Sequence, residues 1–434
     1  MNENRIVKYT SNGKVILLNK ENMHWVRMSS TLYQSKIEDK RAFQEELINK
    51  FDFNAECESC SCAESLHIIT TRKCNMSCDF CSVNCAPDVS VDDELTVAGL
   101  KERVIPIIQE LKPSLQKVII SGGEPFVKVE IEKLVEGIVN FIRKDNIVFQ
   151  TNGLLLNEER INFLLNNVGV IEISIENLFY NTNQYEKMCS ILDVLYNRQA
   201  RLSFSYVVTP YNKEYIERGL ALAARYNAYF QFRMVAPIGR GKAFSIDLYE
   251  QINLYQRAVQ FILSNEYMEK NLSYAFAYSL APKKHCGAVN NILTIAPDGN
   301  VYMCPNMLFE MFKIGDMSED AKRIIEKHRK KASTCQIDNL FNVEKIQKCS
   351  RCVYEFFCGG DCAANCTNEL GNRIEERDCS LQKILTYYTM FVKKDNYKND
   401  FEQLDKYLKY ILENFEQVQC EGFFAKEIEI DYEL

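Results

Sequence analysis

The chain has 434 residues, of which 47% are hydrophobic and 26% are charged, and it is poor in Gly and Pro. This globular composition is enough for several domains and excludes a long disordered segment. The formal net charge of -7 argues against nucleic acid as a partner, because binding phosphates requires a basic surface. No signal-peptide pattern and no apolar run of membrane-spanning length occurs, so we expect a cytoplasmic protein with no membrane partner.

Residues 1–62 form a predicted N-terminal domain. Two strand-like runs flank Asn12 and Gly13, a pair that favours the positive φ angles of a hairpin turn. A short apolar run at residues 24–28 and a helical pattern at residues 37–50 follow. Cys57, Cys60 and Cys62 close this unit, and we expect them to bind nothing, ahead of the alternative of a further metal site.

Residues 63–245 alternate strands with helices. Apolar or alternating runs predict six strands, at residues 66–70, 117–121, 147–151, 170–176, 202–208 and 229–236. A helix is predicted at residues 130–143, where the apolar residues keep helical spacing. Six consecutive βα units predict an α/β fold with a parallel sheet, a partial (β/α)6 TIM barrel. The polar and glycine-rich loops follow the strands, so we expect the active site at the carboxyl ends of the strands.

The rest of the chain divides into three predicted parts. Residues 246–285 are a helical linker, residues 286–380 are a cysteine-rich domain, and residues 381–434 are a helical tail. An amphipathic stripe at residues 399–418 indicates packing rather than a partner site.

The first cysteine cluster follows the first barrel strand. Cys74, Cys78 and Cys81 have the spacing C-x3-C-x2-C. Three thiolates can hold zinc with a fourth ligand from elsewhere, or three corners of a [4Fe–4S] cube. The chain has four His residues, none near this loop in the sequence, which gives a mixed Cys/His zinc site little support.

The motifs around this cluster resemble those of the radical S-adenosylmethionine (SAM) superfamily. Besides the cysteines, they are an aromatic residue before the third cysteine and Gly-Gly-Glu-Pro after the second strand, and the resemblance spans residues 65–242. It implies a [4Fe–4S] cluster whose fourth iron chelates S-adenosylmethionine and whose electron yields a 5'-deoxyadenosyl radical. The implied cofactor contacts are Phe80, Gly122, Gly123, Glu124, Pro125, Asn152, Ser174, Glu176 and Arg233. Cys85 fits no ligand position of the family, and we expect it to be structural.

The second cysteine array begins with Cys286, Gly299 and Cys304 and continues as C-x2-C-x5-C-x3-C before a last cysteine. A bare C-x2-C pair would indicate a zinc ribbon, but the full array resembles the SPASM extension of radical SAM enzymes. The resemblance implies two auxiliary clusters, so three [4Fe–4S] clusters in all. The proximal cluster takes Cys286, Cys304 and Cys362, and the distal cluster takes Cys349, Cys352, Cys358 and Cys379. Either Cys335 or Cys366 completes the proximal cluster, or one iron is open, which we favour.

SPASM enzymes include sulfatase maturases, quinone and mycofactocin cofactor maturases, and peptide-crosslinking enzymes. Sulfatase maturases have an aspartate directly after the second cysteine of the array, where this chain has Pro305, which counts against that activity. The N-terminal hairpin, strand and helix look like a winged-helix-like leader-recognition domain, which would bind a leader peptide by β-augmentation. A barrel-capping subdomain is the alternative for this unit.

The sequence therefore predicts a radical SAM peptide maturase. We expect it to abstract hydrogen from a ribosomally made precursor peptide and to form a cysteine thioether, as in sactipeptide or ranthipeptide maturation. The alternatives are carbon–carbon or carbon–oxygen crosslinking, a sulfatase or quinone-cofactor type maturase, or, in a different class, a non-catalytic iron–sulfur or zinc scaffold. The expected partners are a precursor peptide with a leader and an electron donor such as flavodoxin or ferredoxin.

Overall fold

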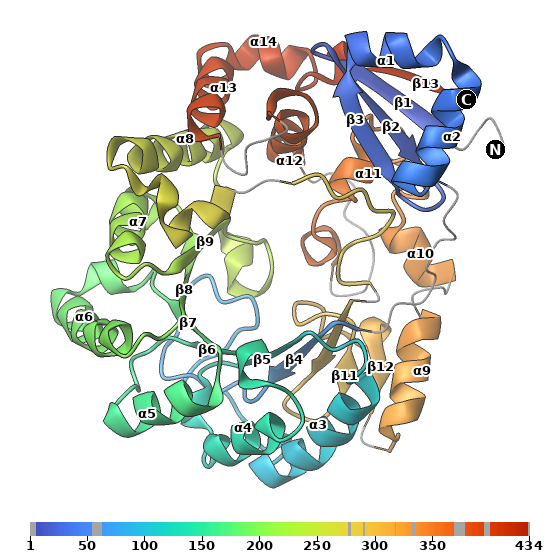
Figure 1. The fold of residues 1–434 in the computed structure, drawn as a ribbon. Coiled ribbons are helices and arrows are strands. Elements are labelled where there is room, and N and C mark those ends of the chain that lie inside the picture. The colour runs from blue at the N-terminus through green and yellow to red at the C-terminus, as the bar shows by residue number, and fades with distance from the viewer. Residues whose placement is uncertain are drawn as a thin grey trace.

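The computed structural model describes residues 6–53, 63–276, 279–289, 291–316, 318–331, 335–368, 378–394 and 400–432. A barrel of parallel strands with helices outside it occupies one half of Figure 1, and the N-terminal sheet and the C-terminal helices occupy the other. In the described part of the chain, no helix is long and apolar enough to cross a bilayer. Cys57, Cys60 and Cys62 lie outside the described residues, so the expectation for them stays a prediction.

Six parallel strands form the partial barrel and confirm the predicted α/β fold class. They are β4 (Ser65–Ile69), β5 (Lys117–Ser121), β6 (Ile147–Thr151), β7 (Val170–Ser174), β8 (Leu202–Val208) and β9 (Tyr229–Met234). The helices that alternate with them are α3 (Val97–Leu111), α4 (Ile131–Val139), α5 (Glu158–Asn167), α6 (Thr182–Asn197) and α7 (Ile216–Arg225). Three strands have the predicted bounds, and the other three differ by one or two residues.

The barrel core lies between the strands and the outer helices. In β7, Ile171 and Ile173 are buried, whereas Glu172 between them faces the barrel interior, as the two-residue period of a strand requires. On α4, Leu134 is fully buried, and burying such a side chain contributes about 2 kcal/mol. The α4 helix ends at Val139, before the predicted end at residue 143, where the chain tightens into a turn.

Three further strands extend the barrel sheet and were not predicted. They are β10 (Ile292–Ile295), β11 (Val301–Tyr302) and β12 (Lys313–Gly315). The first of them pairs parallel to β4, so the cysteine-rich domain continues the same nine-stranded sheet. Buried Arg103 of α3 ties the two parts together, because its guanidinium donates hydrogen bonds to the carbonyls of Gly299, Asp316 and Glu319.

The N-terminal unit is a four-stranded sheet with two helices. Its elements are β1 (Ile6–Ser11), β2 (Lys14–Asn19), β3 (Trp25–Ser29), α1 (Ser30–Ile37), α2 (Lys40–Phe51) and β13 (Glu429–Tyr432). The predicted hairpin is confirmed, with positive φ angles of 46° at Asn12 and 67° at Gly13. The predicted helix at residues 37–50 corresponds to α2, which begins three residues later, and α1 before it was not predicted. The strand order β13-β1-β2-β3 shows that the C-terminal tail adds a strand to this sheet, which the sequence did not predict.

The N-terminal sheet is docked on the cysteine-rich domain. Tyr9 and Trp25 both contact Phe357 edge-on, with ring centroids 5.5 and 6.5 Å apart. The Arg27 guanidinium donates hydrogen bonds to the carbonyls of Thr389 and Met390. These contacts hold the sheet against the segment that carries the later cysteines, since Phe357 immediately precedes Cys358.

The remaining helices pack between these parts. They are α8 (Leu248–Ser264), α9 (Ala321–Lys331), α10 (Cys335–Phe341), α11 (Glu355–Cys358), α12 (Ser380–Tyr387), a π-helix (Tyr388–Val392), α13 (Phe401–Glu413) and α14 (Phe415–Cys420). The apolar stripe predicted at residues 399–418 is buried where it falls on α13, which packs on α8. Phe401 contacts Phe276 at 6.2 Å, which confirms a packing role for this stripe.

Candidate active site

The first cysteine cluster lies at the carboxyl ends of the barrel strands. Cys74, Cys78 and Cys81 line one side of a cavity of about 380 Å3, and the ends of β5 to β9 line the rest. The Met76 amide donates to Cys74 Sγ at 3.4 Å, and the Asn177 side-chain amide donates to Cys78 Sγ at 3.2 Å. Burial raises the pKa of the Cys78 thiol to about 12, so a metal that binds it must displace its proton.

The loop after β9 clamps the cysteine loop. The Arg240 guanidinium donates hydrogen bonds to the carbonyls of Cys78, at 2.8 Å, and Cys85, at 2.6 Å, while its backbone amide bonds to the Cys81 carbonyl at 3.0 Å. Gly239 allows this approach, because a Cβ atom there would lie 2.4 Å from the Cys81 carbonyl oxygen. The sequence drew attention to this glycine-rich loop but not to Arg240.

The Gly-Gly-Glu-Pro motif shapes the cavity wall through its backbone. A Cβ atom on Gly123 would lie 2.3 Å from the Lys73 carbonyl oxygen, so only glycine fits beside the cysteine loop. Gly122 and Gly123 line the cavity, whereas Glu124 and Pro125 are buried behind it. The Glu124 carboxylate accepts hydrogen bonds from the Thr151 hydroxyl and from the amides of Phe126 and Asn152.

The other predicted cofactor contacts meet in the same cavity. Phe80, Asn152, Ser174, Glu176 and Arg233 all line it. The Asn152 side chain donates to Asn75 at 2.7 Å, which ties the third strand's loop to the cysteine loop. Glu176 is buried, and one of its carboxylate oxygens has no hydrogen-bond partner among the described residues. Burial raises its pKa to about 7.

Cys85 also lies in this cavity and is buried. Its backbone amide donates to Cys81 Sγ at 3.3 Å. A hydrogen bond from the Cys85 side chain, opposed by burial, lowers the pKa of the Cys81 thiol to about 6. Cys85 is therefore a neighbour of the three predicted ligands, and its structural role stays a prediction.

The proximal trio of the second array is brought together by the fold. Burial and, to a smaller extent, the neighbouring thiols of Cys362 and Cys286 raise the pKa of Cys304 to about 12. Asn306, two residues after Cys304, lines the barrel cavity beside the first cysteine cluster. No local sequence pattern pointed to Asn306, because only the fold brings this turn against the barrel.

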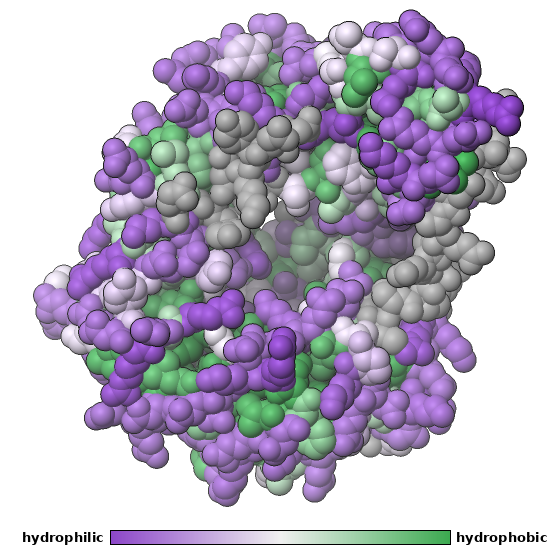
Figure 2. Space-filling model, in the orientation of Figure 1, coloured by the Kyte–Doolittle hydropathy of each residue, from purple (hydrophilic) through white to green (hydrophobic). Residues whose placement is uncertain are grey.

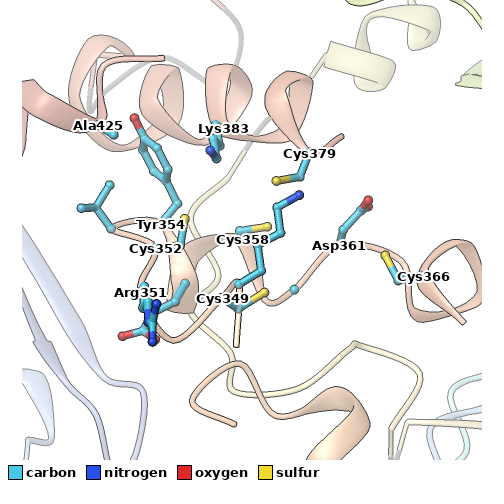
Figure 3. Close-up of a pocket in the computed structure, with 14 residues that line it drawn as sticks. Cys349, Arg351, Cys352, Tyr354, Cys358, Asp361, Cys366, Cys379, Lys383 and Ala425 are labelled. Carbon is cyan, nitrogen blue, oxygen red and sulfur yellow. The ribbon is translucent and has the colours of Figure 1, made fainter. Parts of the chain in front are cut away.

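The distal group surrounds a separate pocket of about 210 Å3. Cys349, Cys352, Cys358 and Cys379 line it, together with Cys366 (Figure 3). In this view Cys366 lies to one side, beyond Asp361. Cys366 thus borders the distal pocket, which has four other cysteines around it. The side chain of Cys335, the other predicted candidate, lies outside the described residues.

The barrel cavity suits an iron–sulfur cluster with S-adenosylmethionine. The three predicted ligands offer thiol donors, and the cavity wall has a glycine where any side chain would collide. Among the described residues, one buried carboxylate oxygen in the wall has no hydrogen-bond partner. Within the described ranges, no three His, Cys, Asp or Glu side chains converge as the ligands of a single metal ion would. The thiol ligands of a [4Fe–4S] cube instead bind different irons at separate corners, so they do not converge on one point.

Comparisons with known proteins agree with this site. The radical SAM superfamily model matches residues 68–223, and the SPASM model, described as an iron-sulfur cluster-binding domain, matches residues 286–353. Mycofactocin maturase MftC of Mycobacterium tuberculosis is 25% identical over 337 residues, covering 73% of this chain and 81% of MftC.

Two solved structures share the fold. Streptococcus suis SuiB bound to S-adenosylmethionine has a TM-score of 0.51 and 14% identity, covering 83% of this chain and 95% of SuiB. The enzyme anSMEcpe with bound AdoMet and a peptide has a TM-score of 0.56 and 16% identity, covering 80% of this chain and 99% of anSMEcpe.

The fold and the cysteine cavity define a radical SAM domain. The chain is a radical SAM enzyme with a SPASM domain after the barrel, and these domains imply S-adenosylmethionine and iron–sulfur clusters as its cofactors.

Proposed function

We propose that this chain is a peptide maturase that crosslinks a ribosomally made precursor peptide, most directly through a cysteine thioether. The observation that carries the proposal is the cavity that Cys74, Cys78 and Cys81 share with Gly123 and Glu176, one of whose carboxylate oxygens has no hydrogen-bond partner in the described part of the chain. The likeness to MftC, named a maturase, and to the fold of SuiB, solved with its precursor peptide SuiA, supports a peptide as substrate.

The three cysteines of the barrel loop would hold the first cluster. With S-adenosylmethionine bound there, the cluster supplies a 5'-deoxyadenosyl radical. Gly122 and Gly123 line the cavity and would present their backbone to the cofactor, and Glu176 offers an acceptor for its ribose hydroxyls. Phe80, Asn152, Ser174 and Arg233 line the remaining walls. The Glu124 carboxylate accepts hydrogen bonds from Thr151 and Asn152 behind the cavity wall, so it would hold these neighbours in position and would not contact the cofactor itself.

The two later cysteine groups would hold two auxiliary clusters, for three [4Fe–4S] clusters in all. The distal group has four thiols of its own around one pocket. The proximal trio of Cys286, Cys304 and Cys362 leaves one iron open, which supports coordination of a substrate thiolate. The position of Cys366 favours this arrangement over one in which Cys366 completes the proximal cluster.

The N-terminal sheet would bind the leader of the precursor. Within the described chain, β1 is covered by β13, and β3 lies at the other edge with β2 as its partner. An unpaired strand edge offers backbone hydrogen bonds to an extended peptide. The docking of this sheet through Phe357 would then set the distance from the leader to the clusters.

Carbon–carbon or carbon–oxygen crosslinking is the second candidate. The matched relative is named a mycofactocin maturase, a name that specifies no thioether. Pro305, which directly follows Cys304, speaks against the sulfatase type. A non-catalytic scaffold is disfavoured because the barrel cavity is shaped for a small-molecule cofactor as well as for metal.

The test is iron and sulfide analysis of the anaerobically reconstituted protein beside the Cys74→Ala, Cys78→Ala, Cys81→Ala triple variant, with an assay for 5'-deoxyadenosine. We expect about twelve irons to fall to about eight and deoxyadenosine to be lost.

The protein is then co-produced with each short peptide encoded beside its gene, and the masses of the peptides are measured. A crosslinked peptide loses two hydrogen atoms, and a modified peptide without cysteine would contradict the thioether. Zinc in place of iron, or no deoxyadenosine from the unmodified protein, would favour the scaffold.

A further inference from the structure

The barrel interior contains a polar network centred on Glu172 of β7. Gln150 of β6 donates to one carboxylate oxygen of Glu172 at 2.8 Å, and Gln231 of β9 donates to the other at 3.3 Å. Gln231 also contacts the Ser203 hydroxyl of β8 and accepts a hydrogen bond from Arg233 at 2.8 Å. Four adjacent strands therefore fix the position of one carboxylate inside the barrel.

This carboxylate lies between two cavities. Glu172 and Arg233 line the 380 Å3 cofactor cavity, and they also line a second cavity of about 610 Å3 at the amino ends of the strands. The second cavity includes the exposed residues Lys117, Asp145 and Arg201 in its wall, so it reaches solvent. Among the described residues, only Glu172 and Arg233 border both spaces.

The charges that face Glu172 come from several strands. They are Lys117 of β5 and Arg233 of β9, which favour its ionised form, and Glu176, which follows β7 and disfavours it. His67 of β4 lies on the strand next to Lys117, and burial keeps it neutral by lowering its pKa to about 4. Burial of Glu172 outweighs the two cations and raises the pKa of its carboxyl above the usual value. It is thus a stronger base than a surface carboxylate.

Peptide crosslinking must release one proton. When a C–H bond and an S–H or second C–H bond are replaced by one new bond, two hydrogens leave. One leaves as a hydrogen atom to the 5'-deoxyadenosyl radical, giving 5'-deoxyadenosine, and the other leaves as a proton while one electron passes to an auxiliary iron–sulfur cluster. We propose that Glu172 is the catalytic base that takes this proton from the peptide in the cofactor cavity and passes it to solvent through the second cavity.

Two other features single out Glu172. Glu176 is the other carboxylate that lines the cofactor cavity, and the proposed function assigns it to the cofactor ribose. Asn306, which lines the cavity from the cysteine-rich domain, offers no base, since its side chain carries no ionisable group. This inference rests on the proposed function but not on the type of bond formed.

The test compares Glu172→Gln with the unmodified enzyme, using the precursor peptide that the co-production experiment identifies. We expect Glu172→Gln to lower the ratio of crosslinked peptide to 5'-deoxyadenosine about 100-fold or more relative to the unmodified enzyme. Glu172→Asp, which keeps a carboxylate, should restore part of the product. Glu136→Gln on the exposed face of α4 is the control and should change nothing. Iron content and melting temperature are measured for every variant.

A normal yield of crosslinked peptide from Glu172→Gln would overturn the inference. So would an equal loss of deoxyadenosine in the absence of peptide, since Glu172 would then serve the cofactor rather than the peptide. The pH profile at saturating S-adenosylmethionine is the second readout: product formation should fall as the pH drops through the pKa of Glu172, whereas peptide-free deoxyadenosine formation should not. If the unmodified enzyme modifies no peptide, the proposed function itself fails, and that outcome is distinct from either of these.

Discussion

The Thr151 hydroxyl lies 2.9 Å from both carboxylate oxygens of the buried Glu124. This pair joins the loop after β5 to the end of β6, behind the wall that Gly122 and Gly123 present to the cofactor cavity. The Asn152 amide, which donates to the same carboxylate, extends the link towards the cysteine loop. One buried acid thus holds together three loops of the site.

Thr151→Val tests this link, because valine keeps the shape of threonine but removes its donor. Leaving a buried charged group short of a hydrogen bond costs about 2 kcal/mol. We expect a lower denaturant midpoint for barrel unfolding and weaker S-adenosylmethionine binding. The control is Thr182→Val at the exposed start of α6, which should change stability by less than about 0.5 kcal/mol. Equal behaviour of the two variants would contradict the role of the pair.

The role of Glu124 shows where sequence reasoning about the site stopped. Motif spacing identified the glycines that line the cavity, but it could not separate a residue that faces the cavity from one that supports its wall. Arg240, Asn177 and Asn306 were missed for a related reason. Their contacts join segments far apart in the sequence, and no local pattern reports such contacts.

The fold, like the site, was predicted from the sequence in some parts and not in others. The barrel strands were predicted because each is a short apolar run followed by an amphipathic helix. The pairing of β13 with β1 was not, because it joins the two ends of the described chain and a four-residue strand has almost no signal of its own. Figure 2 shows that the face in view is hollowed between the barrel and the N-terminal sheet.

Gly239→Ala should disrupt the first cysteine cluster. The φ angle of 55° at Gly239 costs a non-glycine residue about 1–2 kcal/mol, and the added Cβ would collide with the Cys81 carbonyl. We expect the reconstituted variant to lose about four irons per chain and its deoxyadenosine activity. Gly287→Ala, beside Cys286 but with open space around the added Cβ, should keep its iron. An unchanged iron content in Gly239→Ala would contradict this prediction and show that the cysteine loop tolerates being displaced by the added Cβ.

Binding of S-adenosylmethionine should depend on pH through Glu176. Because burial raises the pKa of this carboxyl to about 7, it is largely protonated at pH 6 and ionised at pH 8. The ionised form accepts hydrogen bonds from the ribose hydroxyls, so affinity should rise with pH and be about tenfold weaker at pH 6 than at pH 8. Equilibrium dialysis with labelled cofactor measures this difference.

Glu176→Gln separates this effect from the cofactor's own titration. The cofactor's amino group has an ordinary pKa near 8 and also loses its proton in this range. The variant should bind more weakly and keep only the part of the pH dependence that belongs to the amino group. An identical pH profile in the variant and the unmodified protein would exclude Glu176 as the titrating group.

Ser29→Pro tests whether the open edge of the N-terminal sheet binds the leader. The Asn19 backbone amide donates to the His24 carbonyl, and the Ser30 amide donates to the Gly13 carbonyl. Residues of an antiparallel strand alternately bond to the partner strand and point away from it, so the Ser29 amide points away from β2, to the open edge. The φ of -69° at Ser29 suits proline, so the change removes this donor without strain in the backbone.

Ser29→Ala is the matched control, since both variants lose the side chain that caps α1 but only proline loses the amide. We expect the leader segment of the identified precursor, carrying a fluorescent label, to bind Ser29→Pro about fivefold more weakly than Ser29→Ala, the loss of about one hydrogen bond. Equal affinity for both variants would place the leader elsewhere and leave this sheet as a cap on the cysteine-rich domain.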